Sequence, residues 1–135
     1  MIYLVLITIN HLGKKMRCIF NLQIEYDEKV EKYFSNFDLM RKKIGNDMTK
    51  TIKKRINQLM AADTFGIYLS TGLGKPHSLE NDLKGFYGVS ISKNYRLIIK
   101  PNTDDLSSEY LKVCKLVKIK GVEDYHGTKH EWIIP

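Results

Sequence analysis

The sequence has 135 residues, a length that suits one domain, and its hydrophobic fraction of 43% is enough for one modest core. Lys and Arg number 22 against 15 Asp and Glu, and the formal charge of +7 favours an acidic partner such as nucleic acid, an acidic protein or an anionic membrane surface. The two cysteines, Cys18 and Cys114, have no CxxC spacing and no neighbouring histidine cluster, which argues against a zinc site. We expect both to be buried, reduced thiols.

The first nine residues, MIYLVLITI, form a strongly apolar run. A membrane span needs about 20 such residues, and no basic residue precedes the run, so neither a span nor a signal peptide is expected. We expect residues 1–15 to be an apolar extension that shields a sheet edge, a dimerising arm or an upstream extension before a start at Met16. Residues 16–126 would form the domain and residues 127–135 a short tail, in a cytoplasmic protein.

The first predicted element of the domain is a strand over residues 18–26, where apolar and polar side chains alternate. Asp27 is a candidate N-cap for a short helix from about 28 to 36. A longer helix is expected from about 39 to 61, with Asp38 as its candidate N-cap.

The longer helix has one apolar stripe and one basic face. The stripe consists of Met40, Ile44, Met48, Ile52, Ile56, Leu59 and Met60. The basic face carries Arg41, Lys42, Lys43, Lys50, Lys53, Lys54 and Arg55. Gly45 weakens the middle by about 1 kcal/mol relative to alanine, which tertiary packing can offset. The basic face is either a solvated surface, an RNA contact or the binding site of an acidic partner.

The second half of the chain begins with a predicted long loop over residues 62–82. Three strands are then expected, at 86–92, 95–100 and 111–122, with a tight turn at Lys93-Asn94 and a polar loop from 101 to 108. Helices and strands grouped in this way predict an α+β fold, in which two N-terminal helices pack on one face of a mostly antiparallel sheet.

Three places carry residues suited to chemistry: the loop around His77, the strand around Arg96, and Glu123-Asp124-Tyr125-His126 near the end of the last strand. Each alone is more typical of an ordinary surface or packing residue. Together, two adjacent strands and a loop can bring His77, Arg96 and His126 to one sheet face. Cleavage of RNA by its own 2′-hydroxyl needs a base, an acid and a cation at the phosphate, and two histidines and an arginine supply these without a metal.

Four stretches resemble the HigB branch of the RelE/ParE toxin superfamily, the plasmid-maintenance "killer" proteins. They are IEYDEKVEKYF at 24–34, MRKKIGNDMTKTIKKRINQLMAAD at 40–63, PHSLENDLKGFYGVSISKNYRLIIKPN at 76–102 and VKIKGVEDYH at 117–126. The resemblance covers about three-quarters of the chain, in the family's order and spacing.

The resemblance implies a RelE-like fold and a toxin of a type II toxin–antitoxin system. Such a toxin is a ribosome-dependent endoribonuclease, an mRNA interferase that enters the ribosomal A site and cuts translated mRNA without a cofactor. It also implies a helix-turn-helix antitoxin as partner, through which the complex binds operator DNA.

The family's site residues transfer by position to this chain. His77 matches the loop histidine, Arg96 the strand arginine, and Asp124, Tyr125 and His126 the terminal triplet. In this hypothesis His77 and His126 act as acid and base, Arg96 stabilises the transition state, Tyr125 stacks on a base or orients the phosphate, and Asp124 orients a histidine. Lys84 and Lys93 would contact backbone phosphates.

The sequence departs from the family's pattern in two places. Residues 79–85 carry two fewer basic residues than the family's usual run and one added acid, and Lys93-Asn94 replaces the usual Gly-Asn turn. Two alternatives stay open: a ParE-like gyrase poison, and a non-catalytic nucleic-acid binder of the same fold. Neither His11 nor His130 receives a role from the resemblance.

Overall fold

A computed structural model describes residues 7–9, 15–17, 21–126 and 129–135. Strands β1 (Ile7–Ile9) and β2 (Lys15–Arg17) form a two-stranded antiparallel pair. Most of the predicted extension at 1–15, like residues 18–20 of the first predicted strand, lies outside the described residues. The described part of that strand is confirmed as β3 (Gln23–Tyr26).

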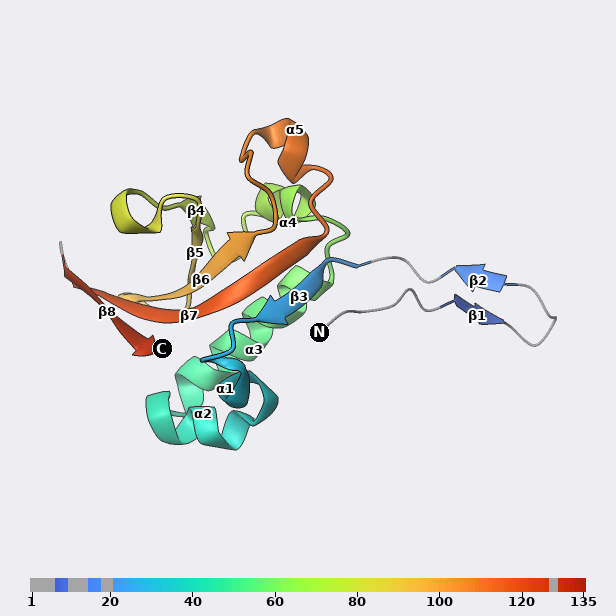
Figure 1. Cartoon of the computed structure of the whole chain (residues 1–135). Coiled ribbons are helices and arrows are strands. Elements are labelled where there is room, and N and C mark those ends of the chain that lie inside the picture. The colour runs from blue at the N-terminus through green and yellow to red at the C-terminus, as the bar shows by residue number, and fades with distance from the viewer. Residues whose placement is uncertain (1–6, 10–14, 18–20, 127–128) are drawn as a thin grey trace.

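The main sheet has six strands, in the order β3-β7-β6-β5-β4 with β8 also paired to β7 (Figure 1). The remaining bounds are β4 (His77–Ser78), β5 (Tyr87–Ser90), β6 (Tyr95–Pro101), β7 (Leu116–His126) and β8 (Lys129–Ile134). Every pairing is antiparallel except that of β3 with β7. The long strand β7 therefore pairs with β3 along its first part and with β8 along its second.

The first helices confirm two predicted helical regions and correct their bounds. The chain forms α1 (Glu31–Ser35), α2 (Phe37–Ile44) and α3 (Asn46–Met60). The single long helix predicted for 39–61 is wrong, because Gly45 adopts φ 89° and ψ 168° and separates α2 from α3. The N-cap of α2 is Asn36 and not Asp38, since the Asn36 side chain accepts from two amides of the first turn.

Several expectations for the second half are also corrected. The loop predicted for 62–82 contains α4 (Phe65–Thr71), which Thr64 caps by accepting a hydrogen bond from Ile67 N and which ends at Gly72 with φ 70°. The turn η1 (Asn81–Leu83) follows, and α5 (Ser108–Leu111) lies where a polar loop and the start of a strand were expected. The last predicted strand is shifted to 116–126, and the predicted tail forms β8.

The core lies between the helices and one face of the sheet, with α3 crossing behind β3 and β7 in Figure 1. Its helical side includes Met40, Ile52, Leu59, Phe65 and Tyr68, and its strand side includes Val89, Leu97, Ile99, Ile119 and Val122. Because successive strand residues point to opposite faces, the residues between these strand positions belong to the other face. The α+β prediction with a mostly antiparallel sheet is confirmed.

Among the described residues, no helix is long and apolar enough to cross a membrane.

Candidate active site

The sheet face that points away from the core carries most of the chemically active side chains. We call it the outer face and define it by Gly88, Ser90, Arg96, Glu123, Tyr125 and His130, which are linked by the strand register. Ser90 pairs with Arg96, and Arg96 pairs with Glu123 on the next strand. Tyr125 pairs with His130 on β8. Four adjacent strands thus contribute side chains to one surface.

A pocket of about 350 Å³ opens on this face, lined by Lys75, His77, Ser90, Ser92, Lys93 and Arg96. The structure therefore brings together three predicted site residues, His77, Lys93 and Arg96. Lys75 and the two serines were missed by sequence reasoning. Three permanent or near-permanent cations with two hydroxyl donors match the charge and hydrogen-bonding needs of a phosphate group.

His77 lies at the edge of the pocket with its side chain exposed. Its Nδ1 atom is 3.2 Å from the carbonyl oxygen of Lys75. The imidazole lies over Gly88, its register partner: a methyl group built at Gly88 would be 3.4 Å from Cε1 of the ring. The missing side chain at Gly88 thus makes room for the ring. A neutral ring that donates from Nδ1 to this carbonyl leaves Nε2 to exchange a proton with a ligand.

Arg96 is half-buried and folds its guanidinium back over the β5–β6 turn. Its Nη1 atom donates to three carbonyl oxygens, those of Ser92 at 2.9 Å, Tyr95 at 3.1 Å and Lys93 at 3.2 Å. These bonds use one of the two terminal nitrogens, and they orient the planar fork before any ligand binds. Pre-orientation of this kind lowers the cost of stabilising a phosphorane.

The turn that Arg96 caps is joined to β7. The amide of Tyr125 donates to the carbonyl oxygen of Asn94 at 2.7 Å. Burial and the charge of Glu123 raise the pKa of Tyr125, and the positive charge of Arg96 opposes them. Arg96 and Tyr125 are therefore electrostatic neighbours on the outer face, although they come from different strands.

A second layer of residues holds the pocket from behind. Nε of Arg55, on α3, donates to the carbonyl oxygen of Ser90 at 2.7 Å, and the amide of Ser90 donates to that of Gly74 at the same distance. The hydroxyl of Tyr68 donates to the carbonyl oxygen of Leu73 at 2.6 Å, and burial raises the pKa of Tyr68 to about 12. These hydrogen bonds connect the segment before Lys75 to α4 directly and to α3 through Ser90.

A second polar cluster lies on the outer face beside the β7–β8 pairing. Glu123 is 0% exposed, and both its carboxylate oxygens lie near Nδ1 of His130, at 2.9 and 3.1 Å. The rings of His130 and Tyr125 stack with centroids 5.4 Å apart and planes inclined by 23°. Burial raises the pKa of Glu123, and the hydrogen bond with His130 opposes that rise. Sequence reasoning missed this cluster because His130 falls in the predicted tail.

The other predicted site residues lie apart from the pocket or outside the description. Asp124 pairs with Tyr95, and both belong to the face covered by helices. The backbone of His126 pairs with Lys129, but its side chain lies outside the described residues. Lys84 is exposed just after η1 and does not line the pocket.

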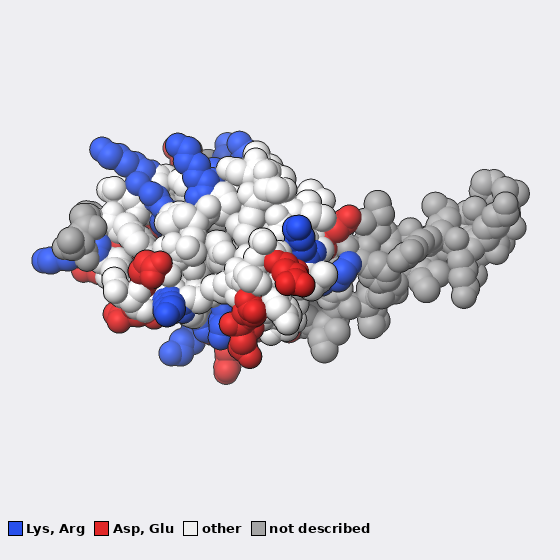
Figure 2. All heavy atoms as spheres, turned by 90° about the horizontal axis from the view of Figure 1, so that it is seen from above, with Lys and Arg blue, Asp and Glu red and all other residues white. Residues whose placement is uncertain are grey.

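The surface charge follows the site only in part. In Figure 2, Lys and Arg side chains project from the upper left of the molecule, and the acidic side chains of that view lie mostly lower. Among the residues that the structure describes, no group of three or more His, Cys, Asp or Glu is arranged to hold a metal ion.

Known proteins similar to this chain come from one functional group. No protein-family model matches the sequence. Over 60 residues the chain is 38% identical to toxin YoeB of Streptomyces coelicolor, a match that covers 42% of this chain and 66% of that toxin, just under two-thirds of its length.

Three solved structures have a similar fold. The YoeB/ParE toxin from Agrobacterium tumefaciens has a TM-score of 0.50 at 14% identity, with 78% of this chain and 99% of that chain covered. The toxin in the YoeB–YefM complex from Staphylococcus aureus gives 0.48 at 23% identity over 78% and 98% of the two chains. YafQ from E. coli gives 0.48 at 20% identity over 76% and 91%.

The match with a TM-score of 0.50 confirms the RelE-like fold expected from the sequence, whereas assignment to the HigB branch remains a prediction. The relative in sequence is a YoeB toxin, and the structural match that reaches 0.50 is a YoeB/ParE toxin. The chain is thus similar to a YoeB toxin in sequence over part of its length, and to a YoeB/ParE toxin in fold.

Proposed function

We propose that this protein is the toxin of a type II toxin–antitoxin pair and that it cleaves mRNA on the ribosome. The observation that carries the proposal is the pocket on the outer face, which combines His77 and Arg96 with two lysines, Lys75 and Lys93. A cationic pocket with a histidine at its rim suits a phosphodiester better than a neutral ligand. The net charge of +7 supports a polyanionic substrate.

The proposed reaction is attack of the ribose 2′-oxygen on the adjacent phosphorus. A base removes the 2′-hydroxyl proton, the new P–O2′ bond forms, and the P–O5′ bond breaks to give a 2′,3′-cyclic phosphate and a 5′-hydroxyl. Arg96 and the lysines would stabilise the extra negative charge on the phosphorane. His77, in its protonated form, would supply the proton to the leaving 5′-oxygen. We keep His126 as a candidate for proton transfer and Lys84 as a contact to flanking phosphates.

A toxin of this type would have an antitoxin and the ribosome as partners. An acidic segment of a helix-turn-helix antitoxin would cover part of the basic surface, as the solved complex of YoeB with YefM makes reasonable for a related fold. Operator DNA would then be bound through the antitoxin. The toxin would act in the cytoplasm, at the ribosomal A site.

The test is cleavage of a defined mRNA on purified translating ribosomes by wild type, Lys75→Ala, Arg96→Ala and Lys112→Ala. Lys112 is an exposed lysine at the end of α5, outside the pocket, so this variant has the same loss of charge as Lys75→Ala. Cleavage by wild type that falls in the first two variants but not in Lys112→Ala supports the proposal.

The alternative targets give different outcomes in the same preparation. Wild type that leaves mRNA intact but inhibits DNA supercoiling by purified gyrase would identify a ParE-like poison. Wild type that binds RNA without cutting it would identify a non-catalytic binder. Cleavage that is equal in all variants would keep the nuclease activity and remove the pocket from it.

A further inference from the structure

The Glu123–His130 pair has the geometry of an oriented proton-transfer unit. The Glu123 carboxylate is wholly buried, and its two oxygens face the same ring nitrogen, Nδ1 of His130, at 2.9 and 3.1 Å. When Glu123 is ionised its carboxylate can only accept, so the neutral ring then carries its proton on Nδ1 and leaves Nε2 as the basic atom. The His130 side chain is 39% exposed, which gives solvent or a ligand access to the ring.

Burial of a carboxylate is costly unless a partner satisfies it. A surface histidine that served only for packing would not need a buried carboxylate as partner, because water can satisfy its ring nitrogens. A buried carboxylate that holds a histidine increases the basicity of the ring and stabilises the imidazolium that forms when Nε2 accepts a proton. The hydrogen bond to Glu123 directs the Nδ1 edge of the imidazole, and the stacked ring of Tyr125 restricts the tilt of its plane.

The pair lies beside the phosphate pocket. Arg96 is the register partner of Glu123, and its charge acts on Tyr125, whose ring His130 contacts. β6 and β8 are two strand spacings apart, about 10 Å between backbones, and His130 pairs with Tyr125, two positions along β7 from Glu123, so a ligand between Arg96 and His130 would lie on a diagonal of the outer face. A phosphate held by Arg96 would thus have its own ribose within reach of His130.

We propose that His130, oriented by Glu123, is the general base of the RNA-cleaving site. The inference rests on the proposed function and adds a residue that the predicted site lacks. Nε2 of His130 accepts the 2′-hydroxyl proton as the 2′-oxygen bonds to phosphorus, and the leaving 5′-oxygen takes its proton from His77. In this site His130 is the catalytic residue and Glu123 the positioning residue, because Glu123 acts only through the ring it holds.

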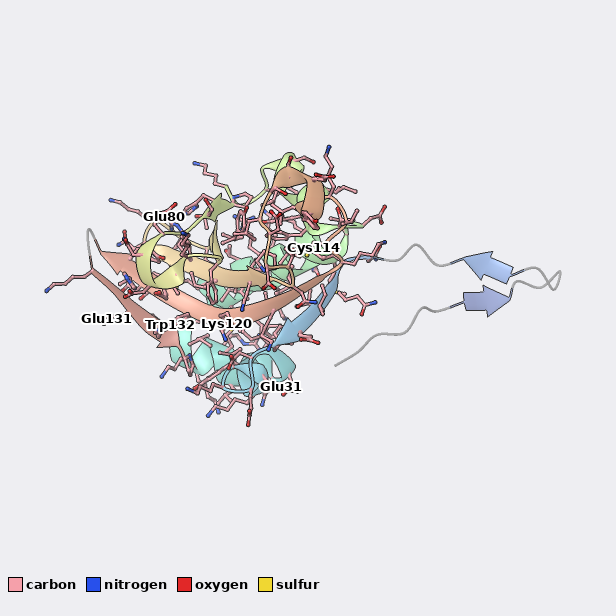
Figure 3. All side chains as sticks on the ribbon, turned by 45° about the horizontal axis from the view of Figure 1, so that its top comes forward. Glu31, Glu80, Cys114, Lys120, Glu131 and Trp132 are labelled. Atoms are coloured by element: carbon pink, nitrogen blue, oxygen red, sulfur yellow. The ribbon has the colours of Figure 1, made fainter. Side chains whose placement is uncertain are left out.

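The first variant is His130→Gln, which removes the imidazole and keeps a side-chain amide that can donate to the buried carboxylate. Glu123→Gln loses the charge that orients the ring, and Glu131→Gln is its matched control. Glu131, labelled in Figure 3, lies next to His130 on β8, is exposed and pairs with Asp124, so strand alternation places it on the opposite face. Single-turnover cleavage is measured on programmed ribosomes across pH 5 to 9, with binding measured separately and thermal melting as a folding check.

We expect His130→Gln to cleave at least about 100-fold more slowly at pH 7 with ribosome binding unchanged, the usual contribution of a general base. Glu123→Gln should lose less, and Glu131→Gln should match wild type. The pH–rate profile separates a base from a structural role, since removal of the base removes the rise in rate on the acidic side. Glu123 and Tyr125, which contact the ring, and Arg96, whose charge acts on Tyr125, all remain in His130→Gln.

Two results would overturn the inference while leaving the nuclease intact. One is a His130→Gln protein that cleaves like wild type. The other is a slower variant whose pH–rate profile keeps the shape of wild type. Wild type that cuts no RNA would instead refute the proposed function, and the inference would fall with it.

Discussion

Replacement of Tyr68 by phenylalanine isolates one hydrogen bond that supports the pocket. The ring is wholly buried in the core, and its hydroxyl donates to the carbonyl oxygen of Leu73 at 2.6 Å. Tyr68→Phe keeps the ring and leaves that carbonyl without this donor. The expected loss in free energy of unfolding is about 1–2 kcal/mol at pH 8, the usual cost of a missing partner at a partly buried group.

The same hydroxyl makes the difference depend on pH. Burial raises the pKa of Tyr68 from 10.0 to about 12, so the folded state holds the phenolic proton more tightly than the unfolded state. The stability contributed by the neutral phenol is therefore fully present below pH 10 and is lost as pH rises towards 12. Two pH units correspond to about 3 kcal/mol, which exceeds the hydrogen bond's own contribution. The advantage of wild type should shrink above pH 10.

Urea unfolding of wild type, Tyr68→Phe and Tyr110→Phe measures both effects. Tyr110 is 51% exposed, so its variant should stay within about 0.5 kcal/mol of wild type. Wild type and Tyr68→Phe differ at one side chain, so the other ionisable groups cancel in that comparison. Equal stability of wild type and Tyr68→Phe at pH 8, or a difference that stays constant from pH 8 to 11, would refute the reasoning.

Three further substitutions test the site and the sheet. Arg96→Lys replaces a planar fork by a point charge, and we expect about 100-fold slower cleavage on ribosomes with melting temperature little changed. Gly88→Ala places a methyl group 3.3 Å from Cδ2 of Leu79 and at an ordinary contact distance, 3.4 Å, from Cε1 of His77, so cleavage on ribosomes and melting temperature should change little. Gly121→Ala places its methyl 2.2 Å from a backbone carbonyl oxygen of β8, whereas Gly45 also has a positive φ (89° against 147° at Gly121) but a methyl there would have nothing within 4 Å. Thermal melting should show Gly121→Ala to be less stable by at least about 2 kcal/mol, and equal losses would contradict the steric argument.

The sequence predicted those parts of the fold whose signals are local. Alternation over residues 23–26 and the apolar stripe of residues 40–60 identified β3 and the helical region, since each pattern reports directly on one buried face. The α4 helix was missed although its signals were present, Thr64 as N-cap and Gly72 as the left-handed end. The loop prediction for residues 62–82 rested on the helix-breaking residues Gly66, Gly72, Gly74 and Pro76.

The candidate site was only partly predictable because it depends on strand pairing between distant segments. His77 and Arg96 were singled out by residue type and by resemblance to the toxin family, and Lys93 by resemblance alone, and the short β5–β6 hairpin brings Lys93 and Arg96 together. Lys75 joins the pocket through contacts of its loop with α3 and α4, which no local pattern reports. The His130 contact requires that β8 pair with β7, and a strand in a nine-residue segment has too weak a signal to be distinguished from a tail.

Which residues of β7 lie on the outer face depends on one irregularity that sequence alternation does not reveal. Val117 and Ile119 are buried in the core, so strict alternation would send Glu123 and Tyr125 to the core as well. The register with β6 shifts between Ile98 and Ile99, where β7 contains one extra residue. After the extra residue, Val122 is the core-facing residue, and Glu123 and Tyr125 lie on the outer face, because a one-residue shift exchanges the two faces of a strand.

The extra residue is held in place by its own contacts. Lys120 forms an ion pair with Asp27 at 2.7 Å, and the amide of Asp27 donates to the carbonyl oxygen of Ile119. The hydrogen bond from Lys120 lowers the pKa of Asp27, so this contribution to stability is present at neutral pH and is lost as pH falls through the folded-state pKa of Asp27. Because the bulge decides whether Glu123 or Asp124 shares a face with Arg96, an ion pair remote from the pocket helps to determine which carboxylate can orient a histidine beside it.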